Sequence, residues 1–332
     1  MKALEVCPGT LAEGYSSYSP VCLKNVFNSQ KVSPVLSYFP PDKDEQVVEQ
    51  FIENRKRISI SGVQEKLSLV LDERILRLTE EEEQGTHILK PIPRDLRRVK
   101  QVPANEHLTM QIAKQVYKLK VAENALIFFK DGTPAYLTKR FDLKEDGEKW
   151  GVEDFATLAG KSIDSGGSNF KYEYTYEEIG ALIRQYVPAW RVEIERYFKL
   201  VLFNYLFSNG DAHLKNFSLL ETSKGDHLLS PAYDLINTSL HVSDTAFALS
   251  KGLFTDDFKS IDYQRNAYPS RRDFAEFGKR IGVQERRIER LIAPFLEKQS
   301  MVETLLKRSF LDESSKKGYQ ISYNTKRNYL NA

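Results

Sequence analysis

The segment at residues 208–220 holds the residues whose types and spacing point most clearly to chemistry. It reads SNGDAHLKNFSLL, in which Asn216 follows Asp211 by five positions. ATP-dependent kinases use this spacing: the aspartate accepts the proton of a substrate hydroxyl, and the asparagine side-chain oxygen binds Mg²⁺. A loop held between a buried helix and a strand can aim both short side chains at one point.

Asp234 offers the second metal ligand that such a site requires. Mg²⁺ takes near-octahedral oxygen ligation and rarely rests on one protein group. Asp234 lies in LLSPAYDLINTSL, after a second short apolar run. This order of strand, turn and strand places Asn216 and Asp234 at the same end of a hairpin, where they can share one ion. Asn and Asp at strand ends also form turns by bonding their own backbone, and that alternative stays open for either residue alone.

A phosphate-binding turn is expected in RISISGVQEKLSLVLD, residues 57–72. The turn residues are Ser59, Ser61, Gly62 and Val63, whose backbone N–H groups can point at phosphate oxygens. The Walker pattern GxxxxGK[ST] is absent from the chain, which argues against a P-loop NTPase.

Lys90 ends the apolar run HILKP, so a strand is expected to hold it. Protein kinases use a lysine on a strand to bind the α- and β-phosphates. An acid on a nearby helix keeps that lysine charged and oriented. Glu106 is the candidate acid. The alternatives are an edge-strand lysine and a glutamate favoured by the dipole at a helix N-terminus.

Two patterns along the chain position these residues. From Arg57 to about Phe141, short apolar runs predict strands: SLVLD and RILRLT across a tight turn, THILKP, and ALIFFKDGTPAYLTKRF with Asp131-Gly132 at its bend. One helix is expected between them, from about Pro103 to Leu119.

Beyond Gly147 the pattern is helical. Thr175 and Glu178 predict a capping box, and RVEIERYFKLVLFNYLF predicts a long buried helix. The expected fold class is therefore α+β and bilobal, with a small β-rich N-lobe and a larger helical C-lobe. We expect a loose N-terminal arm and a helix over 1–56, the N-lobe with the phosphate loop over 57–146, and the C-lobe with the catalytic loop and metal site over 147–332.

Composition restricts the environment and the partners. The 48 basic and 46 acidic residues give a net charge of +2, so neither a general nucleic-acid binder nor a membrane-surface protein is indicated. Two cysteines in 332 residues point to a reducing compartment, and the expected location is cytoplasmic. No apolar stretch reaches the roughly 18 residues of a spanning helix, and no signal peptide is expected.

Seven strings, taken together and in order, resemble the HipA family of serine/threonine kinases, the toxins of bacterial toxin–antitoxin modules. They span about residues 57–240 and read SISGVQEKLSL, THILKP, NEHLTMQIA, LTKRFD, VEDFATLAG, NGDAHLKNFSLL and LSPAYDL. The resemblance implies a kinase-like bilobal fold that uses ATP and Mg²⁺.

The same resemblance implies roles for individual residues. Asp211 would be the catalytic base, Asn216 and Asp234 would hold magnesium, and Lys90 would bind phosphate. Backbone contacts with adenine are implied near Lys139 and Phe141. His213 stands at the family's histidine position in the catalytic loop, where a role near the transferred phosphate competes with that of a hydrogen-bonded loop histidine.

The chain departs from full-length HipA toxins because its phosphate loop begins by residue 57. It therefore resembles the short HipT-type toxins, whose missing portion is a separate small HipS-like partner, with a HipB-like DNA-binding antitoxin as third component. The head of the chain resembles a cysteine/histidine-bearing segment of some short relatives. Its ligands would be only Cys7 and Cys22, with Ser19 where a histidine might stand, so no zinc is expected.

The resemblance also implies self-inhibition and a substrate class. HipA-like kinases phosphorylate a serine of their own phosphate loop, here Ser59 or Ser61, and a phosphate there would repel nucleotide or restructure the loop. The alternative is that both hydroxyls only cap the turn. An aminoacyl-tRNA synthetase is the substrate class that relatives suggest. A small-molecule kinase of the aminoglycoside or lipid type and a catalytically silent antitoxin-binding module remain alternative functions.

Overall fold

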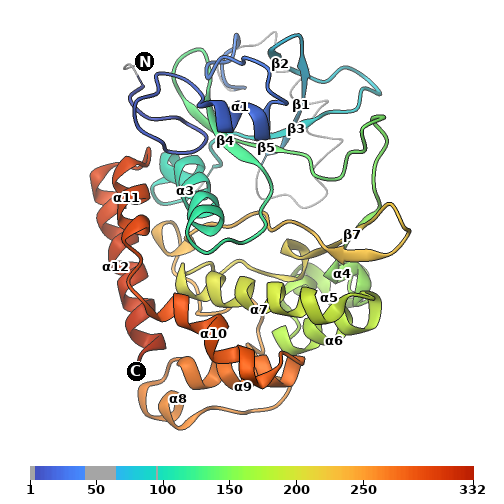
Figure 1. The fold of residues 1–332 in the computed structure, drawn as a ribbon, viewed down its shortest axis with the longest axis vertical. Helices are drawn as coiled ribbons and strands as arrows, with labels where there is room; N and C mark the ends of the chain where they lie inside the picture. Colours follow the sequence, from blue (N-terminus) through green and yellow to red (C-terminus); the bar gives the residue numbers. More distant parts are fainter. Residues whose placement is uncertain (1–3, 42–64, 95) are drawn as a thin grey trace. The chain divides into compact units, whose positions relative to one another are not determined.

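A computed structural model describes residues 4–41, 65–94 and 96–332 (Figure 1). Its contacts divide the chain into two units. Unit 1 comprises Met1–Ile112, Ala122–Glu148 and Val302–Lys316, and unit 2 comprises Ala113–Val121, Lys149–Met301 and Lys317–Ala332. The fold is α+β and bilobal, as predicted. No sequence pattern had indicated that residues 302–316 return to unit 1.

Unit 1 is built on a five-stranded antiparallel sheet with the order β2-β1-β3-β5-β4. The strands are β1 (Leu67–Asp72), β2 (Ile75–Leu78), β3 (His87–Lys90), β4 (Asn124–Phe128) and β5 (Pro134–Lys139). The predicted hairpins β1–β2 and β4–β5 are confirmed. Gly132 takes φ +86° at the tip of the second hairpin, where a left-handed residue lets the chain reverse.

The N-terminal segment packs into the core of unit 1, so the prediction of a loose arm was wrong for residues 4–41. Cys7, Tyr18 and Phe27 are buried with the apolar face of the sheet, and the Tyr18 hydroxyl donates to the Leu126 carbonyl at 2.8 Å. A short helix, α1 (Pro20–Val26), starts at its Ser19 cap. The predicted helix before residue 57 lies outside the described residues.

The helix α3 (Val102–Gln115) follows a 3-10 turn, η1 (Val99–Gln101). The predicted helix continued to Leu119, but the last turn is different. Lys118 takes φ +53° and the Leu119 N–H bonds the Ala113 carbonyl at 3.0 Å. A left-handed residue ends the helix in this way because it redirects the chain while satisfying a terminal carbonyl.

Unit 2 is mainly helical, and its central helix is α7 (Trp190–Leu206). Eleven of its residues are buried, which confirms the predicted buried helix. The helix α6 (Tyr176–Tyr186) packs beside it and begins with the predicted Thr175–Glu178 capping box. The other helical segments of unit 2 are α4 (Phe155–Leu158), α5 (Ile163–Gly166), η2 (Gly167–Tyr172), η3 (Leu214–Asn216), η4 (Thr238–Leu240), α8 (Ile261–Asn266), α9 (Arg271–Ile281) and α10 (Glu285–Leu296). Most of α11 (Ser300–Arg308) belongs to unit 1, and α12 (Glu313–Leu330) begins in unit 1 and continues into unit 2.

A small three-stranded antiparallel sheet completes unit 2. Its strands are β6 (Val152–Asp154), β7 (Ser218–Glu221) and β8 (His227–Leu229), in the order β6-β7-β8. The β7–β8 hairpin confirms the predicted order of strand, turn and strand before Asp234. Within the described part of the chain, no helix has the length and apolar character needed to cross a membrane.

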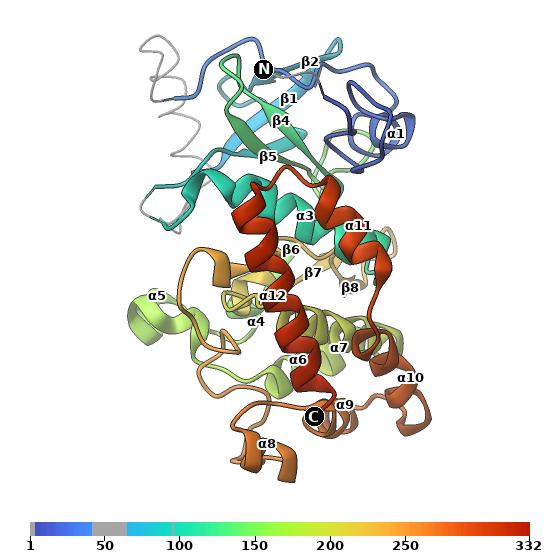
Figure 2. The same cartoon turned by 90° about the vertical axis from the view of Figure 1, so that its left-hand side faces the viewer.

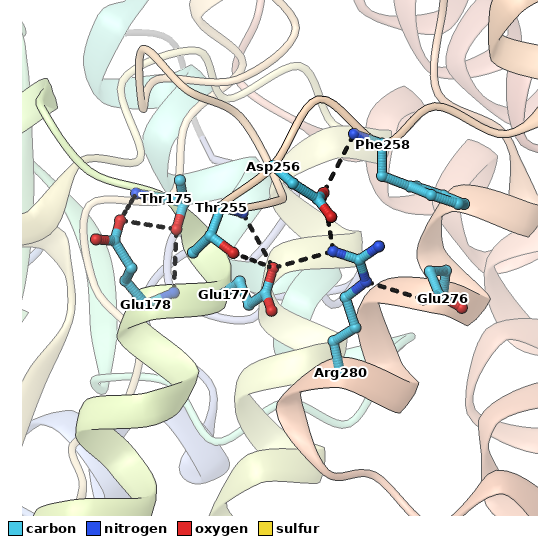
Figure 3. Close-up of polar contacts among 8 residues, drawn as sticks. All are labelled: Thr175, Glu177, Glu178, Thr255, Asp256, Phe258, Glu276 and Arg280. Atoms are coloured by element: carbon cyan, nitrogen blue, oxygen red, sulfur yellow. Dashed lines mark hydrogen bonds and ion pairs between the residues drawn. The ribbon is translucent and has the colours of Figure 1, made fainter.

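A polar network fastens the irregular segment that follows Asp234 in the chain (Figure 3). Arg280 of α9 donates to Glu276 at 2.8 Å and to Asp256 at 2.9 Å. Glu177 of α6 accepts from the Thr255 N–H at 3.0 Å. The network thereby ties residues 255–256 to two helices of unit 2. Figure 2 shows the same helices from a second direction.

Candidate active site

Asp211 lies in a turn directly after the buried helix α7. Ser208 takes φ +51° beyond the helix end and redirects the chain. Buried Asn209 fastens the turn: its side chain donates to Asn204 Oδ1 at 3.0 Å and accepts from the Asp211 N–H at 3.3 Å. The Asp211 side chain is 54% exposed. An accessible carboxylate is therefore carried on a rigid, buried support.

Asn216 and Asp234 come together at one end of the β7–β8 hairpin. The amide nitrogen of Asn216 donates to Asp234 Oδ2 at 3.4 Å, and its oxygen accepts from the His213 N–H at 3.2 Å. Asp234 takes φ +55°, a left-handed conformation that Asp adopts more readily than most residues. Asn209 also donates to the Asp234 carbonyl at 3.4 Å. One buried amide thus links the backbones of Asp211 and Asp234.

His213 is buried next to Asp211. Its Nε2 lies 3.9 Å from Asp211 Oδ1, and burial lowers the pKa of His213 to about 4. The imidazole is therefore neutral at physiological pH. Its Nδ1 has no hydrogen-bond partner among the described residues. A buried ring nitrogen without a partner costs free energy unless an ordered water satisfies it.

Tyr172, the last residue of η2, contacts this group although no sequence pattern indicated it. Its hydroxyl donates to Asp211 Oδ1 at 2.8 Å, and its ring packs edge-on against His213. Asn209 also had no assigned role, although it directly precedes Gly210 and Asp211. Its position in the NGD string is the one local signal that could have identified it.

Unit 1 contains the ion pair that the sequence suggested. Lys90 of β3 lies with its Nζ 2.7 Å from Oε1 of Glu106 on α3, and both side chains are almost completely buried. The Lys90 ammonium also lies 5.4 Å from the centre of the Tyr136 ring, within cation–π range. A buried charge pair of this kind fixes the lysine in one orientation at the cost of desolvating both groups.

Lys139, one of the two residues expected near adenine, forms hydrogen bonds within unit 1. The Lys139 N–H bonds the Glu123 carbonyl at 2.7 Å, and the Lys139 ammonium donates to Asn28 at 2.6 Å. Burial lowers the pKa of Lys139. The contact of Lys139 with adenine stays a prediction, as does the contact near Phe141.

The expected phosphate-loop residues lie outside the described residues. They are Ser59, Ser61, Gly62 and Val63.

The Asn216–Asp234 pair has the donor chemistry that Mg²⁺ prefers, one carboxylate and one amide oxygen. Among the described residues, no group of three or more His, Cys, Asp or Glu side chains is arranged to hold a metal. Magnesium in phosphoryl-transfer sites takes one or two protein groups and completes its shell with phosphate oxygens and water. A cation at this pair would face the Asn216 amide oxygen in place of its nitrogen.

The family model of the HipA-like C-terminal domain matches residues 58–302. A protein of Haemophilus influenzae named "Putative kinase" is 27% identical over 317 residues, covering 91% of this chain and 89% of the relative. "Putative kinase Y4dM" of Sinorhizobium fredii is 32% identical over 224 residues, covering 62% of this chain and 52% of that protein.

Two solved structures share the fold. HipA of Shewanella oneidensis, solved with HipB and its operator DNA, has a TM-score of 0.65 at 20% identity, covering 86% of this chain and 71% of HipA. The Helicobacter pylori proinflammatory kinase CtkA has a TM-score of 0.51 at 16% identity, covering 77% of this chain and 90% of CtkA. These similarities confirm the kinase-like fold. The extent of the family match shows that the chain belongs to the HipA-like C-terminal domain family.

Proposed function

We propose that the chain is an ATP- and Mg²⁺-dependent protein kinase that phosphorylates serine or threonine hydroxyls. The kinase names of two relatives and the fold shared with HipA and CtkA support the reaction class. The observation that carries the proposal is that the buried amide of Asn209 bonds the backbones of both Asp211 and Asp234. Asn216 in turn bonds the Asp234 carboxylate. Residues far apart in sequence thus supply a base and two oxygen ligands from one rigid support.

Each polar group would then have one role. Asp211 would accept the proton of the attacking hydroxyl, and Asn216 with Asp234 would hold Mg²⁺, which neutralises charge on the phosphates. Lys90, oriented by Glu106, would bind phosphate oxygens. His213 is neutral, so it would lie beside the proposed base without adding positive charge.

The biological role that we propose is that of a toxin in a bacterial toxin–antitoxin system. HipA of Shewanella oneidensis was solved with HipB and operator DNA, so a HipB-like DNA-binding antitoxin is the proposed partner here, with a small HipS-like protein as the third component. Growth arrest would follow from phosphorylation of a translation component, for which an aminoacyl-tRNA synthetase is our candidate.

We also propose that the kinase inhibits itself by phosphorylating Ser59 or Ser61. A phosphate adds nearly two negative charges and three acceptor oxygens. In a loop that binds nucleotide phosphates, that charge would oppose ATP binding.

Labelling with radioactive ATP tests the proposed activity. We expect the wild type to label itself in the presence of Mg²⁺ and the Asp211→Asn variant to lose the label. The matched control is Asp257→Asn, which makes the same change at an exposed position of unit 2 and should leave labelling unchanged. Wild-type protein that binds ATP without labelling any protein, or persistent labelling in Asp211→Asn, would refute the proposal.

A further inference from the structure

A cavity of about 320 Å³ in unit 2 lies apart from the residues assigned above. It is lined by residues 118–120, which follow α3, by one face of α7, and by the end of β8 with the segment after it. Four of its lining residues are cationic and none is acidic: Lys118, Lys120, Arg196 and Lys199. This concentration of charge is notable in a chain whose overall net charge is only +2.

Local structure explains why these cations share one place. Lys118 is the left-handed residue that ends α3. Lys120 follows in a segment fixed by the bond from the Ala232 N–H to the Lys120 carbonyl at 2.9 Å. Arg196 and Lys199 are three positions apart on α7, so they project from the same side of that helix. The backbone holding each cation is therefore part of ordered structure.

The charges in the cavity are only partly compensated. Arg196 forms an ion pair with Glu193, which also accepts from the Leu229 N–H at 3.0 Å. The ammonium groups of Lys120 and Lys199 form neither a hydrogen bond nor an ion pair within the described ranges of the chain, although Glu193 attracts the first and Glu195 the second. Burial and the neighbouring Arg196 lower the pKa of both lysines. A bound anion would favour the charged form of both lysines and so raise their pKa.

The rest of the lining decides what kind of anion fits. The remainder of the wall is buried and mainly apolar: Leu119, Leu200, Leu229 and Ala232, with Ser230 as its one uncharged polar residue. Lys118 and Lys120 are exposed and Arg196 and Lys199 are partly buried, so a ligand from solvent can reach the cations while it contacts the apolar wall. The cavity volume lies at the lower limit of the range for small-molecule sites. An acidic polymer would instead require a long groove.

We propose that this cavity binds a small organic anion carrying two or more phosphate groups. Lys120 and Lys199 would contact the phosphates, Lys118 and Arg196 would add charge at the edge, and the apolar wall would contact the body of the ligand. The inference goes beyond the proposed kinase activity and does not depend on it, because none of these residues belongs to the proposed catalytic group.

Titration calorimetry with inorganic pyrophosphate and inorganic phosphate tests the proposal. Pyrophosphate is expected to bind the wild type more tightly than phosphate, and more weakly as salt is raised. The Lys120→Gln/Lys199→Gln double variant should bind pyrophosphate at least about tenfold more weakly, a loss of about 1.4 kcal/mol. The matched control is Lys307→Gln/Lys317→Gln, which removes two exposed lysines from α11 and α12 and should bind like the wild type.

Three outcomes would overturn the inference. Equal weakening in both double variants would mean that only overall charge attracts the anion. Loss of pyrophosphate binding in Asp234→Asn when Mg²⁺ is present, with the Lys120→Gln/Lys199→Gln variant unaffected, would place the ligand at the proposed nucleotide site. Tighter binding of a polyglutamate peptide than of pyrophosphate, lost in the Lys120→Gln/Lys199→Gln variant, would mean that the ligand class is wrong. Circular dichroism and thermal unfolding of each variant verify that it folds.

Discussion

The hydroxyl of Tyr172 donates a hydrogen bond of 2.8 Å to Oδ1 of Asp211. Burial and the neighbouring carboxylate raise the pKa of Tyr172, so the phenol stays protonated and remains a donor at physiological pH. A substrate hydroxyl would approach a catalytic base through the same kind of bond. The chain therefore occupies one oxygen of its proposed base with its own hydroxyl group.

We expect Tyr172→Phe to increase the rate of phosphoryl transfer. A hydrogen bond to a charged group is worth about 1.5–3 kcal/mol, but water would replace the phenol, so a gain of roughly three- to tenfold is expected. Initial rates of self-labelling at saturating ATP measure it, with Tyr186→Phe at an exposed position of α6 as the control. A slower Tyr172→Phe enzyme would show instead that Tyr172 positions Asp211.

Replacing Asp234 by Asn should remove most of the Mg²⁺-dependent activity. The substitution keeps the shape of the side chain and removes the one carboxylate of the Asn216–Asp234 pair. Loss of groups that merely support a metal ligand costs about 10- to 100-fold, so a direct ligand should cost at least 100-fold. We would titrate Mg²⁺ while following ATP turnover and expect the midpoint to rise. Activity and Mg²⁺ dependence equal to those of Asp257→Asn would contradict the metal assignment.

The parts of the fold and of the candidate site that could be predicted from sequence depend on residues close together in the chain. The Asp131-Gly132 turn and the Thr175–Glu178 capping box determine their elements through neighbouring residues. Asn216 and Asp234 meet because a single short hairpin separates them, so their approach follows from strand order alone.

The features that sequence analysis missed depend on contacts between distant segments. The N-terminal segment lacks any hydrophobic period because turns shape it. The Cys7 sulfur accepts N–H bonds from Gly9 at 3.3 Å and Ser19 at 3.1 Å, and Tyr18 reaches the sheet across 108 positions. Tyr172 contacts Asp211 across 39 positions. Contacts between segments so far apart in the chain produce no periodic pattern in the sequence.

Three buried histidines should make the protein less stable in mild acid. Burial lowers the pKa of His87, His107 and His213 to about 4, from 6.5 for an exposed histidine. Between pH 6.5 and 4 the unfolded chain binds protons that the folded chain does not. The free energy of unfolding therefore falls as the pH is lowered through this window, by at most about 1.4 kcal/mol per unit for each histidine. Below about pH 4 this contribution levels off.

Urea unfolding at pH 7, 6 and 5 measures this slope. His107→Gln should reduce it, because an amide can keep the 3.0 Å contact with the Gly9 carbonyl without titrating. The matched control is His227→Gln, which makes the same substitution at an exposed position of β8. The comparison uses slopes, so a general loss of stability in either variant does not affect it. An unchanged slope in His107→Gln would contradict the prediction.

Gly210 directly precedes the proposed base, Asp211, and a small substitution there should displace that base. A Cβ there would lie 2.4 Å from Asp244 Oδ2 and 2.5 Å from its Cγ, while the Gly210 N–H is held by Thr238 at 2.8 Å. Since the backbone is fixed by that bond, either Asp244 must swing away or the turn carrying Asp211 must shift. Misplacing a catalytic group by about 1 Å can cost 100-fold in rate, so we expect Gly210→Ala to lower self-labelling at least tenfold.

Asp244→Gly provides the decisive background for this variant, because all three atoms nearest to the new methyl group belong to Asp244. If crowding is the cause, Gly210→Ala should change the rate by less than about twofold when Asp244 is already glycine, since contacting residues show a coupling that distant ones do not. An equal loss in both backgrounds would mean that the turn needs the backbone freedom of glycine itself. Because Gly210 has no positive φ, an alanine fits its backbone conformation, and the crowding explanation is the one that we expect the cycle to support.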